Sequence, residues 1–456
     1  MSKRLKNFQI NTIDLHDKQD AWFFKEFINI RKPVKIINSS ELILNIEDFK
    51  IDNLCEFLKW GDELMVETKT GGGFGNGNKR VKLTLDDLVS KLKNGEDQYY
   101  LTTQYEEHAE PSDDESERED DSEADEDDEY DLDKQFSEDL TPQTEQPVES
   151  KEGDEPDSDS DSDFDFENLK DDYQDDDDEE PEEEGDRDDD DDDDEPRHVK
   201  ELFQPPLTNI YDKIPIQPPF FKNLIPQQIN LWMGLTKPKK FDNTKDFPID
   251  KTIPKGTSSG LHHDHSDNLY IVVSGCKRFT LFSPFDAYKL YTVGKIFKIY
   301  GNGVIDYEIN EFAPDWNHIN DDGSLQEEQE TKEIKKIIED LDPPNFSKIP
   351  PILLHLNELS ETQMDKLVAF SKKNFPDLIS LENYKIWLKS GDMLYLPAGW
   401  FHEVSSFGKE NEDRELENKD NIHIALNYWF APPNNDEFDK PYKTSFWAKE
   451  FENMLR

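Results

Sequence analysis

The second half of the chain carries the alternation of apolar and polar residues that is typical of β-strands. These runs begin near Ser259, and turns rich in Gly and Pro separate them. The clearest runs are LHHDHSDNLYIVV, KRFTLFSP, IWLKSGDMLYLP and HIALNYWF. Short strands broken by such turns predict an all-β barrel or sandwich for this half of the chain.

The first 104 residues mix helical and strand patterns. Across the whole chain, apolar residues at helical spacing predict helices at residues 20–32, 83–95, 326–341, 360–375 and 446–455. Strands are predicted at residues 33–38 and 98–104. The glycine-rich run 70–80 lacks the Gly-Lys-Ser/Thr ending of a phosphate-binding loop, so we interpret it as a hairpin turn.

Acidic residues are concentrated in one segment. The formal net charge of the chain is −54, and residues 105–199 contain 51 Asp and Glu against 6 Lys and Arg, a net of −45. This segment offers little apolar surface to offset the entropy of ordering, so we predict a disordered acidic insertion. Such an insertion either only solvates the protein or recruits a basic protein partner, and it argues against nucleic-acid binding because phosphates are repelled.

The remainder, with a net charge of −9, is predicted to form one domain in two parts. The predicted segments are an N-terminal part (1–104), the insertion (105–199), a β core with charged loop insertions (200–434) and a C-terminal helical segment (435–456). Two cysteines, no secretion signal and no apolar run of ~20 residues argue against disulfides, export and a membrane span. We therefore expect a location in the cytoplasm, the nucleus or both.

Three histidines and two aspartates crowd the start of the first strand run, GLHHDHSDNLY. Because residues two apart in a strand share a face, His262 and Asp264 project together while His263 points the other way. A metal site needs a third ligand from another strand, and His402 is the best candidate, with His423 as a weaker alternative. Two imidazoles and one carboxylate on one side of a metal form the facial triad of non-haem Fe(II) oxygenases.

The strand register suggests an inward lysine. A two-residue turn at 274–275 would place Lys277 opposite Val272, on the face that also carries Asp264 and Asn268. A buried ammonium without an anion is costly, so an inward lysine beside a metal predicts an acidic small molecule as its partner.

These residues resemble the JmjC oxygenases, in the stretches SGLHHDHSDNLYIVVSGCKRFTLFSP, GDMLYLPAGWFHEV and ALNYWF. The resemblance implies a mainly β fold with flanking helices, the double-stranded β-helix (jelly roll, cupin-like) of JmjC proteins. It further implies that His262, Asp264 and His402 hold Fe(II), and that Lys277 binds the distal carboxylate of 2-oxoglutarate. The implied reaction uses O2 to convert 2-oxoglutarate to succinate while a substrate C–H bond is oxidised.

Further stretches are similar to the JmjC lysyl hydroxylases that modify developmentally regulated GTP-binding proteins. They are INLWMG, the spacing HxDHxxNLYxVxSG and the tail APPNNDEFDKPYKTSFW. By that similarity the cosubstrate pocket would be lined by Tyr100, Ser259, Asn268, Tyr270 and Asn427. The similarity also implies a protein substrate, such as a GTP-binding protein, and a homodimer through the C-terminal helices.

Three functions stay open at this point: a protein hydroxylase acting on lysine, a histone lysine demethylase, and a non-catalytic cupin-like scaffold with an acidic arm. The hydroxylase is the preferred hypothesis, because the ligand set is complete and no chromatin-reader domain is visible. The acidic insertion, the loop 235–256 and the segment from Asn317 to about Phe346 exceed the compact family pattern. The motifs therefore indicate the cofactor chemistry better than the substrate.

Overall fold

The computed structural model describes residues 6–69, 73–74, 79–104, 197–237, 251–310, 316–326, 342–408 and 418–455. The chain divides into two compact units, residues 1–112 with 196–456, and residues 113–195; all described residues belong to the first unit. The acidic segment up to residue 196 and residues 327–341 of the predicted helix lie outside the described residues. The described residues begin again with the 3-10 helix η4 (Arg197–Leu202).

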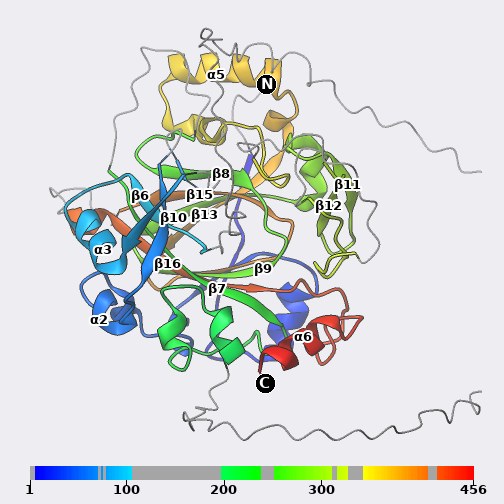
Figure 1. Cartoon of the computed structure of the whole chain (residues 1–456). Coiled ribbons are helices and arrows are strands. Elements are labelled where there is room, and N and C mark those ends of the chain that lie inside the picture. The colour runs from blue at the N-terminus through cyan, green and yellow to red at the C-terminus, as the bar shows by residue number, and fades with distance from the viewer. Residues whose placement is uncertain are drawn as a thin grey trace, which may run out of the picture. The chain divides into compact units, whose positions relative to one another are not determined.

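Two β-sheets form the centre of the described unit (Figure 1). In spatial order the smaller sheet contains β1 (Lys6–Phe8), β13 (Glu382–Lys389), β10 (Cys276–Phe282), β15 (Phe401–Phe407) and β8 (Thr257–His262). The larger contains β2 (Asn11–Asp14), β3 (Val34–Ile37), β14 (Met393–Leu396), β9 (Asp267–Ser274), β16 (Ile422–Phe430), β7 (Pro226–Leu235), β6 (Tyr99–Leu101), β4 (Glu63–Thr68) and β5 (Arg80–Thr84). β11 (Ile296–Ile299) and β12 (Ile305–Tyr307) form a separate pair.

Alternate residues of the central strands face the interior between the two sheets, as strand geometry requires. The apolar ones form a buried cluster of Tyr270, Val272, Phe279, Leu281, Ile386, Leu388, Leu394, Leu396 and Ala425. Apolar side chains on the opposite faces of the same strands belong to two larger buried clusters. The predicted mainly β, jelly-roll fold is confirmed.

Helices flank the sheets. They are α1 (Asp20–Phe23), which continues into the π-helical turn η1 (Phe24–Ile28), α2 (Leu54–Leu58), α3 (Leu85–Lys93), α5 (Glu361–Asn374) and α6 (Phe446–Met454). The 3-10 helices are η2 (Ser40–Leu42), η3 (Ile46–Phe49), η4, η5 (Thr208–Ile210), η6 (Pro284–Lys289), η7 (Pro351–Glu358), η8 (Leu378–Ser380) and η9 (Asn418–Asn421). No helix among the described residues is both long and apolar enough to cross a membrane.

The predicted helix at 83–95 is shorter at both ends, for local reasons. The hydroxyl of Thr84 accepts a hydrogen bond from the Asp87 N–H, so the helix begins at Leu85. Gly95 follows with φ of +87°, a conformation that glycine adopts at helix C-termini. The predicted helices at 360–375 and 446–455 are confirmed, whereas the helix predicted at 20–32 ends at Ile28 and is π-helical from Phe24 onward.

The predicted hairpin at residues 274–275 is wrong. β9 pairs with β14 and β16 in the larger sheet, whereas β10 pairs with β13 and β15 in the smaller one. Gly275, with φ of +73°, lies where the chain passes from one sheet to the other. Lys277 is nevertheless fully buried, because it lies opposite Ser406 of β15 on the interior face of β10.

A buried ion pair joins the N-terminal region to the strand that follows the histidine cluster. Arg31 donates two hydrogen bonds to Asp267, one of them at 2.8 Å, and Tyr395 and the Ala398 N–H also donate to this carboxylate, at 2.6 and 2.9 Å. The Trp400 indole donates to the Arg31 carbonyl at 3.0 Å. Asp267 therefore fixes both the start of β9 and the turn that leads to His402.

We expect Asp267→Ala to lower the free energy of unfolding by about 3–5 kcal/mol, because it leaves the largely buried Arg31 side chain without its carboxylate partner. Urea unfolding of the metal-free protein measures this change. In the control variant Glu47→Ala an exposed pair with Lys50 is lost, and a change below about 1 kcal/mol is expected. A similarly small change for Asp267→Ala would contradict the structural role assigned to it.

Candidate active site

The structure brings the three predicted metal ligands together. In the antiparallel pair of β8 and β15, His262 lies directly opposite His402, and the centres of the two rings are 4.4 Å apart. β8 ends at His262, and Asp264 follows two residues later. The Asp264 Oδ2 lies 3.7 Å from His402 Nε2. One ligand atom from each residue lies within 4.8 Å of the others, a separation that suits coordination of one metal ion.

The backbone fixes the orientation of both imidazoles. His262 Nδ1 lies 3.1 Å from the Gly260 carbonyl oxygen, and His402 Nδ1 lies 2.9 Å from that of Trp400. A carbonyl oxygen only accepts, so each Nδ1 carries the proton and each Nε2 keeps its lone pair for a metal. Burial, followed by the charge of His402, lowers the pKa of His262 well below its usual value, which keeps this ring in the neutral form that binds metals.

A chain of hydrogen bonds orients the Asp264 carboxylate. The Trp232 indole donates to Asn427 Oδ1 at 2.7 Å, the Asn427 amide donates to Asn268 Oδ1 at 3.2 Å, and the Asn268 amide donates to Asp264 Oδ2 at 3.3 Å. Each member donates to the next, so one Asp264 oxygen is held while the other stays available. The sequence had indicated both asparagines but not Trp232.

Lys277 is a fully buried ammonium in contact with hydroxyl groups. Its Nζ donates to Ser406 Oγ at 2.7 Å and to Tyr100 Oη at 3.4 Å, and it lies 3.2 Å from His423 Nδ1. In the part of the chain that the structure describes, no ion pair joins Lys277 to a carboxylate. Burial lowers the pKa of Lys277 to about 7.

His423 lies beside Lys277 and outside the metal-ligand group, so the alternative of His423 as the third ligand is wrong. Its position follows from β16, where it lies opposite Gly234 of β7 rather than opposite β8. Because an ammonium only donates, His423 Nδ1 accepts and Nε2 carries the proton.

A cavity of about 100 Å³ lies between the sheets at these residues. Its walls include eight of the nine predicted site residues: Tyr100, Ser259, His262, Asp264, Asn268, Tyr270, His402 and Asn427. The ninth, Lys277, reaches this wall through Ser406 and Tyr100. The sequence analysis missed several further lining residues: Phe74, Trp232, Thr257, Ser258, Phe279, Val404, Ser406 and Trp429.

Phe74 belongs to the glycine-rich run 70–80 that was interpreted as a hairpin turn. β4 and β5 pair antiparallel on either side of this run, with Glu67 opposite Arg80, which supports the hairpin. The Phe74 ring stacks on Tyr100 at a centroid distance of 4.8 Å and forms part of the cavity wall. An aromatic residue within a glycine-rich turn was the signal that could have suggested this contact.

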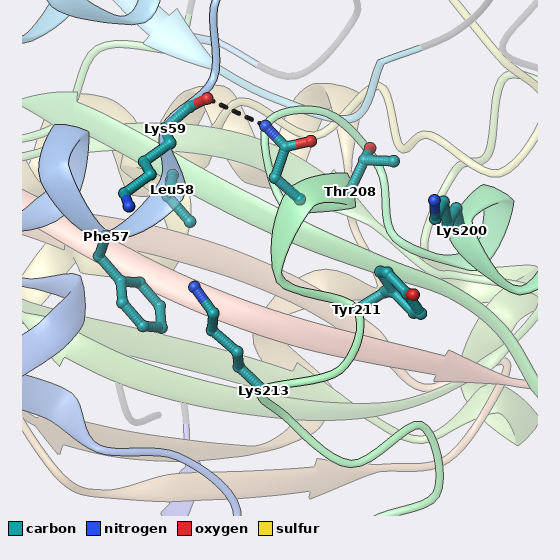
Figure 2. A pocket seen from close by; sticks show the side chains of 8 residues that line it. Phe57, Leu58, Lys59, Lys200, Thr208, Tyr211 and Lys213 are labelled. Atoms are coloured by element: carbon teal, nitrogen blue, oxygen red, sulfur yellow. Dashed lines mark hydrogen bonds between the residues drawn. The ribbon is translucent and has the colours of Figure 1, made fainter. Parts of the chain in front are cut away.

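Another cavity, of about 340 Å³, is larger but has different chemistry (Figure 2). It is lined by Phe57, Leu58, Lys59, Lys200, Thr208, Asn209, Tyr211 and Lys213. These described lining residues include no histidine, cysteine or carboxylate, so they offer no metal-ligand group. The smaller cavity, which combines the ligand group and a buried ammonium, is therefore the candidate active site.

Comparisons with known proteins agree with this fold. A family model described as "Cupin-like domain" matches residues 165–436, more than half of the chain. The chain is 27% identical to "JmjC domain-containing protein 4" of Schizosaccharomyces pombe, over 94% of this chain and 86% of that protein. It is 25% identical to "Lysine-specific demethylase JMJ32" of Arabidopsis thaliana, over 45% of this chain and 42% of that protein. It is 24% identical to "Bifunctional peptidase and (3S)-lysyl hydroxylase JMJD7" of Homo sapiens, over 48% of this chain and 45% of that protein. The chain belongs to the family of cupin-like domains, with JmjC proteins as its relatives.

Proposed function

We propose that this protein is an Fe(II)- and 2-oxoglutarate-dependent dioxygenase. The observation that carries the proposal is the combination of a two-histidine, one-carboxylate group at the cavity with a buried lysine that contacts the cavity wall through Ser406 and Tyr100. The three ligands leave positions open on one side of a metal, as Fe(II) oxygenases require. The lysine supplies the positive charge that a dicarboxylate cosubstrate needs.

The side chains at this site suit both an Fe(II) ion and 2-oxoglutarate chemically. His262, His402 and Asp264 would hold the iron, which supplies the activation of O2 during the oxidation of 2-oxoglutarate. Lys277 would neutralise the distal carboxylate of 2-oxoglutarate. The hydroxyls of Tyr100 and Ser406, which already contact Lys277 Nζ, would donate to that carboxylate at the same place.

Aromatic side chains form much of the cavity wall. Phe74 stacks on Tyr100, and Tyr270 packs edge-on against Phe279 at a centroid distance of 5.1 Å. Trp232 contributes both apolar surface and the indole donor of the Asn427 hydrogen bond. These contacts strengthen the electrostatic interactions of Lys277 by lowering the local dielectric constant.

The affinity for 2-oxoglutarate is expected to depend on pH through Lys277. The pKa of Lys277 is lowered to about 7, and a bound carboxylate would raise it again because it favours the ammonium. Above about pH 7 binding therefore takes up a proton, and the affinity should fall by up to about tenfold per pH unit. The neighbours do not titrate in this range, since burial raises the pKa of Tyr100 above it and burial with the Lys277 charge lowers that of His423 well below it.

Calorimetric titration of the Mn(II)-loaded protein with 2-oxoglutarate at several pH values measures this dependence. The Lys277→Met variant, which has no group to titrate at this position, should bind weakly at every pH without the slope. An equal slope in wild type and variant would assign the proton uptake to another group.

For the substrate we propose a protein, with lysyl hydroxylation as the reaction. Support comes from the relative in Homo sapiens whose name includes (3S)-lysyl hydroxylase activity. Lysine demethylation is the second candidate, because the Arabidopsis thaliana relative is named a demethylase. Each of these two relatives matches less than half of the present chain.

Mass spectrometry separates these two reactions. Cell extract proteins would be incubated with the enzyme, Fe(II) and 2-oxoglutarate, and compared with a matched reaction containing His262→Ala. Hydroxylation adds one oxygen to a lysine side chain, whereas demethylation removes a methyl group and releases formaldehyde. Succinate formation without either peptide change would contradict the proposed lysyl substrate but not the oxygenase chemistry.

A further inference from the structure

Glu403 is a fully buried carboxylate next to the metal-ligand group but on the opposite face of β15. It directly follows His402, so its side chain points away from the cavity. Its carboxylate accepts hydrogen bonds from Ser258 Oγ at 2.6 Å, Ser405 Oγ at 2.8 Å and His355 Nε2 at 2.9 Å. A buried carboxylate with this many donors is held in one position.

The strand beside Glu403 contains a β-bulge. Glu403 lies opposite Leu261, but Ser405 lies opposite Ser258. Two residues of β8, 259–260, therefore face one residue of β15. The second of the two is a glycine with φ of +79°, which suits the bulge conformation. The extra residue turns the Ser258 hydroxyl toward Glu403 on the outer face, although Ser258 also belongs to the cavity wall, and the residues on both sides of the bulge continue the strand.

Hydrogen bonds lead from Glu403 through the bulge to a metal ligand. Ser258 donates to Glu403 and accepts from the Gly260 N–H at 3.1 Å. The Gly260 carbonyl in turn accepts from His262 Nδ1 at 3.1 Å. Gly260, whose carbonyl orients the His262 ring, is thus held through its N–H by the Ser258 hydroxyl, which in turn donates to the Glu403 carboxylate. The Gly260 carbonyl also accepts from Ser259 Oγ at 2.9 Å.

Lys385, Arg278 and the protonation of His355 complete the hydrogen bonds around Glu403. The Lys385 ammonium lies 3.3 Å from His355 Nδ1, which must accept, so Nε2 carries the proton donated to Glu403. Arg278 donates to Ser405 Oγ from Nε at 3.2 Å and from Nη2 at 2.9 Å, and it also pairs with Glu358. The negative charge of Glu403 is therefore balanced in the outer layer of the sheet.

We propose that Glu403, acting through Ser258, is a positioning residue that holds the bulge at 259–260 and thereby aims Nε2 of His262 at the metal. This inference rests on the proposed metal site. Loss of the carboxylate would release the Ser258 hydroxyl and with it the Gly260 N–H, so the backbone dihedral angles of Gly260 would be less restrained and its carbonyl would orient the His262 ring less firmly toward the metal. Partners that orient a metal-binding histidine in this way usually change the affinity for the metal.

The test is Co(II) titration of the metal-free protein, followed by the visible absorption of the bound ion, which does not depend on catalysis. In Glu403→Gln the new NH2 group faces hydroxyl and imidazole groups that now donate to the carboxylate, so at least one of these hydrogen bonds is lost. Ser258→Ala removes the hydroxyl that connects Glu403 to the Gly260 N–H. Each is expected to raise the dissociation constant for Co(II) by about tenfold. The double variant should show little further loss, because both changes break the same connection.

The matched control is Glu358→Gln, which removes an ion pair with Arg278 in the same network without contact to the bulge. It should leave the Co(II) affinity at the wild-type value even where it lowers the melting temperature. If Glu403→Gln and Ser258→Ala also lower only the melting temperature, the network is purely structural and the proposal is overturned. Ser258→Ala removes a single hydroxyl, so it keeps the test valid should Glu403→Gln fail to fold. A wild-type protein that binds no Co(II) would instead contradict the proposed metal site.

Discussion

Replacing His262 with alanine is expected to abolish Fe(II)-dependent conversion of 2-oxoglutarate to succinate, with a loss of at least about 100-fold. The variant removes one of three ligands from a group whose atoms all lie within 4.8 Å of one another. A loss of this size is expected because even residues that only orient a ligand commonly affect metal affinity by about 10- to 100-fold. Succinate is measured directly, with and without added Fe(II).

His318→Ala is the matched control, because this imidazole lies outside the cavity and contacts Asp306 at 3.0 Å. Wild-type turnover is expected for it. Turnover that survived in His262→Ala but disappeared in His318→Ala would place the iron at another site.

Replacing Lys277 with methionine is expected to change stability and cosubstrate binding in opposite directions. The metal-free protein should become more stable, by roughly 1–3 kcal/mol, because a buried ammonium without a carboxylate partner is replaced by an apolar chain of similar length. The KM for 2-oxoglutarate should rise by about 10- to 100-fold, because the charge-assisted hydrogen bond to the distal carboxylate is lost.

The gain in stability should itself depend on pH. Burial lowers the pKa of Lys277 from 10.5 in the unfolded chain to about 7, so the unfavourable charge is fully present below pH 7. Between those two values the unfolded state binds more protons than the folded state, and wild-type stability rises with pH. The difference between variant and wild type is therefore expected to shrink from pH 7 toward pH 10.5.

Lys35→Met provides the contrasting control. Lys35 forms a 2.7 Å ion pair with the buried Asp392, so its removal leaves a carboxylate unpaired and should destabilise the protein. Thermal unfolding and steady-state kinetics of both variants measure these effects. Destabilisation by Lys277→Met together with an unchanged KM would show that Lys277 is a structural residue rather than the cosubstrate ligand.

The metal-ligand group could be predicted because it depends on local geometry. The His-x-Asp spacing at 262–264 puts two side chains on one strand face, and His402 lies in another strand run with suitable flanking turns. The structure brings these residues together across β8 and β15. The ends of α3 could also be read locally, from Thr84 and Gly95.

The pairing of strands could not be predicted in the same way. The inward direction of Lys277 was predicted from a hairpin with Val272, yet β9 and β10 belong to different sheets. Which sheet a strand joins depends on contacts with segments distant in sequence, such as β13 and β15, that leave no local pattern. The conclusion about Lys277 was correct for a reason that the structure does not support.

Residues behind the site were missed for a related reason. Glu403 is a charged residue within a strand, and such a residue usually faces solvent. Its burial depends on η7, which brings His355 against the outer face of the smaller sheet. Trp232 likewise becomes part of the site only because β7 pairs with β16, which carries Asn427.

The most direct test of the central claim is a crystal structure of the protein with Mn(II) and 2-oxoglutarate, prepared without oxygen. We expect an anomalous peak bonded to Nε2 of His262, Nε2 of His402 and a carboxylate oxygen of Asp264, with the distal carboxylate of 2-oxoglutarate on Lys277 Nζ. A metal bound elsewhere, or a cosubstrate whose carboxylate does not contact Lys277, would contradict the proposed oxygenase site.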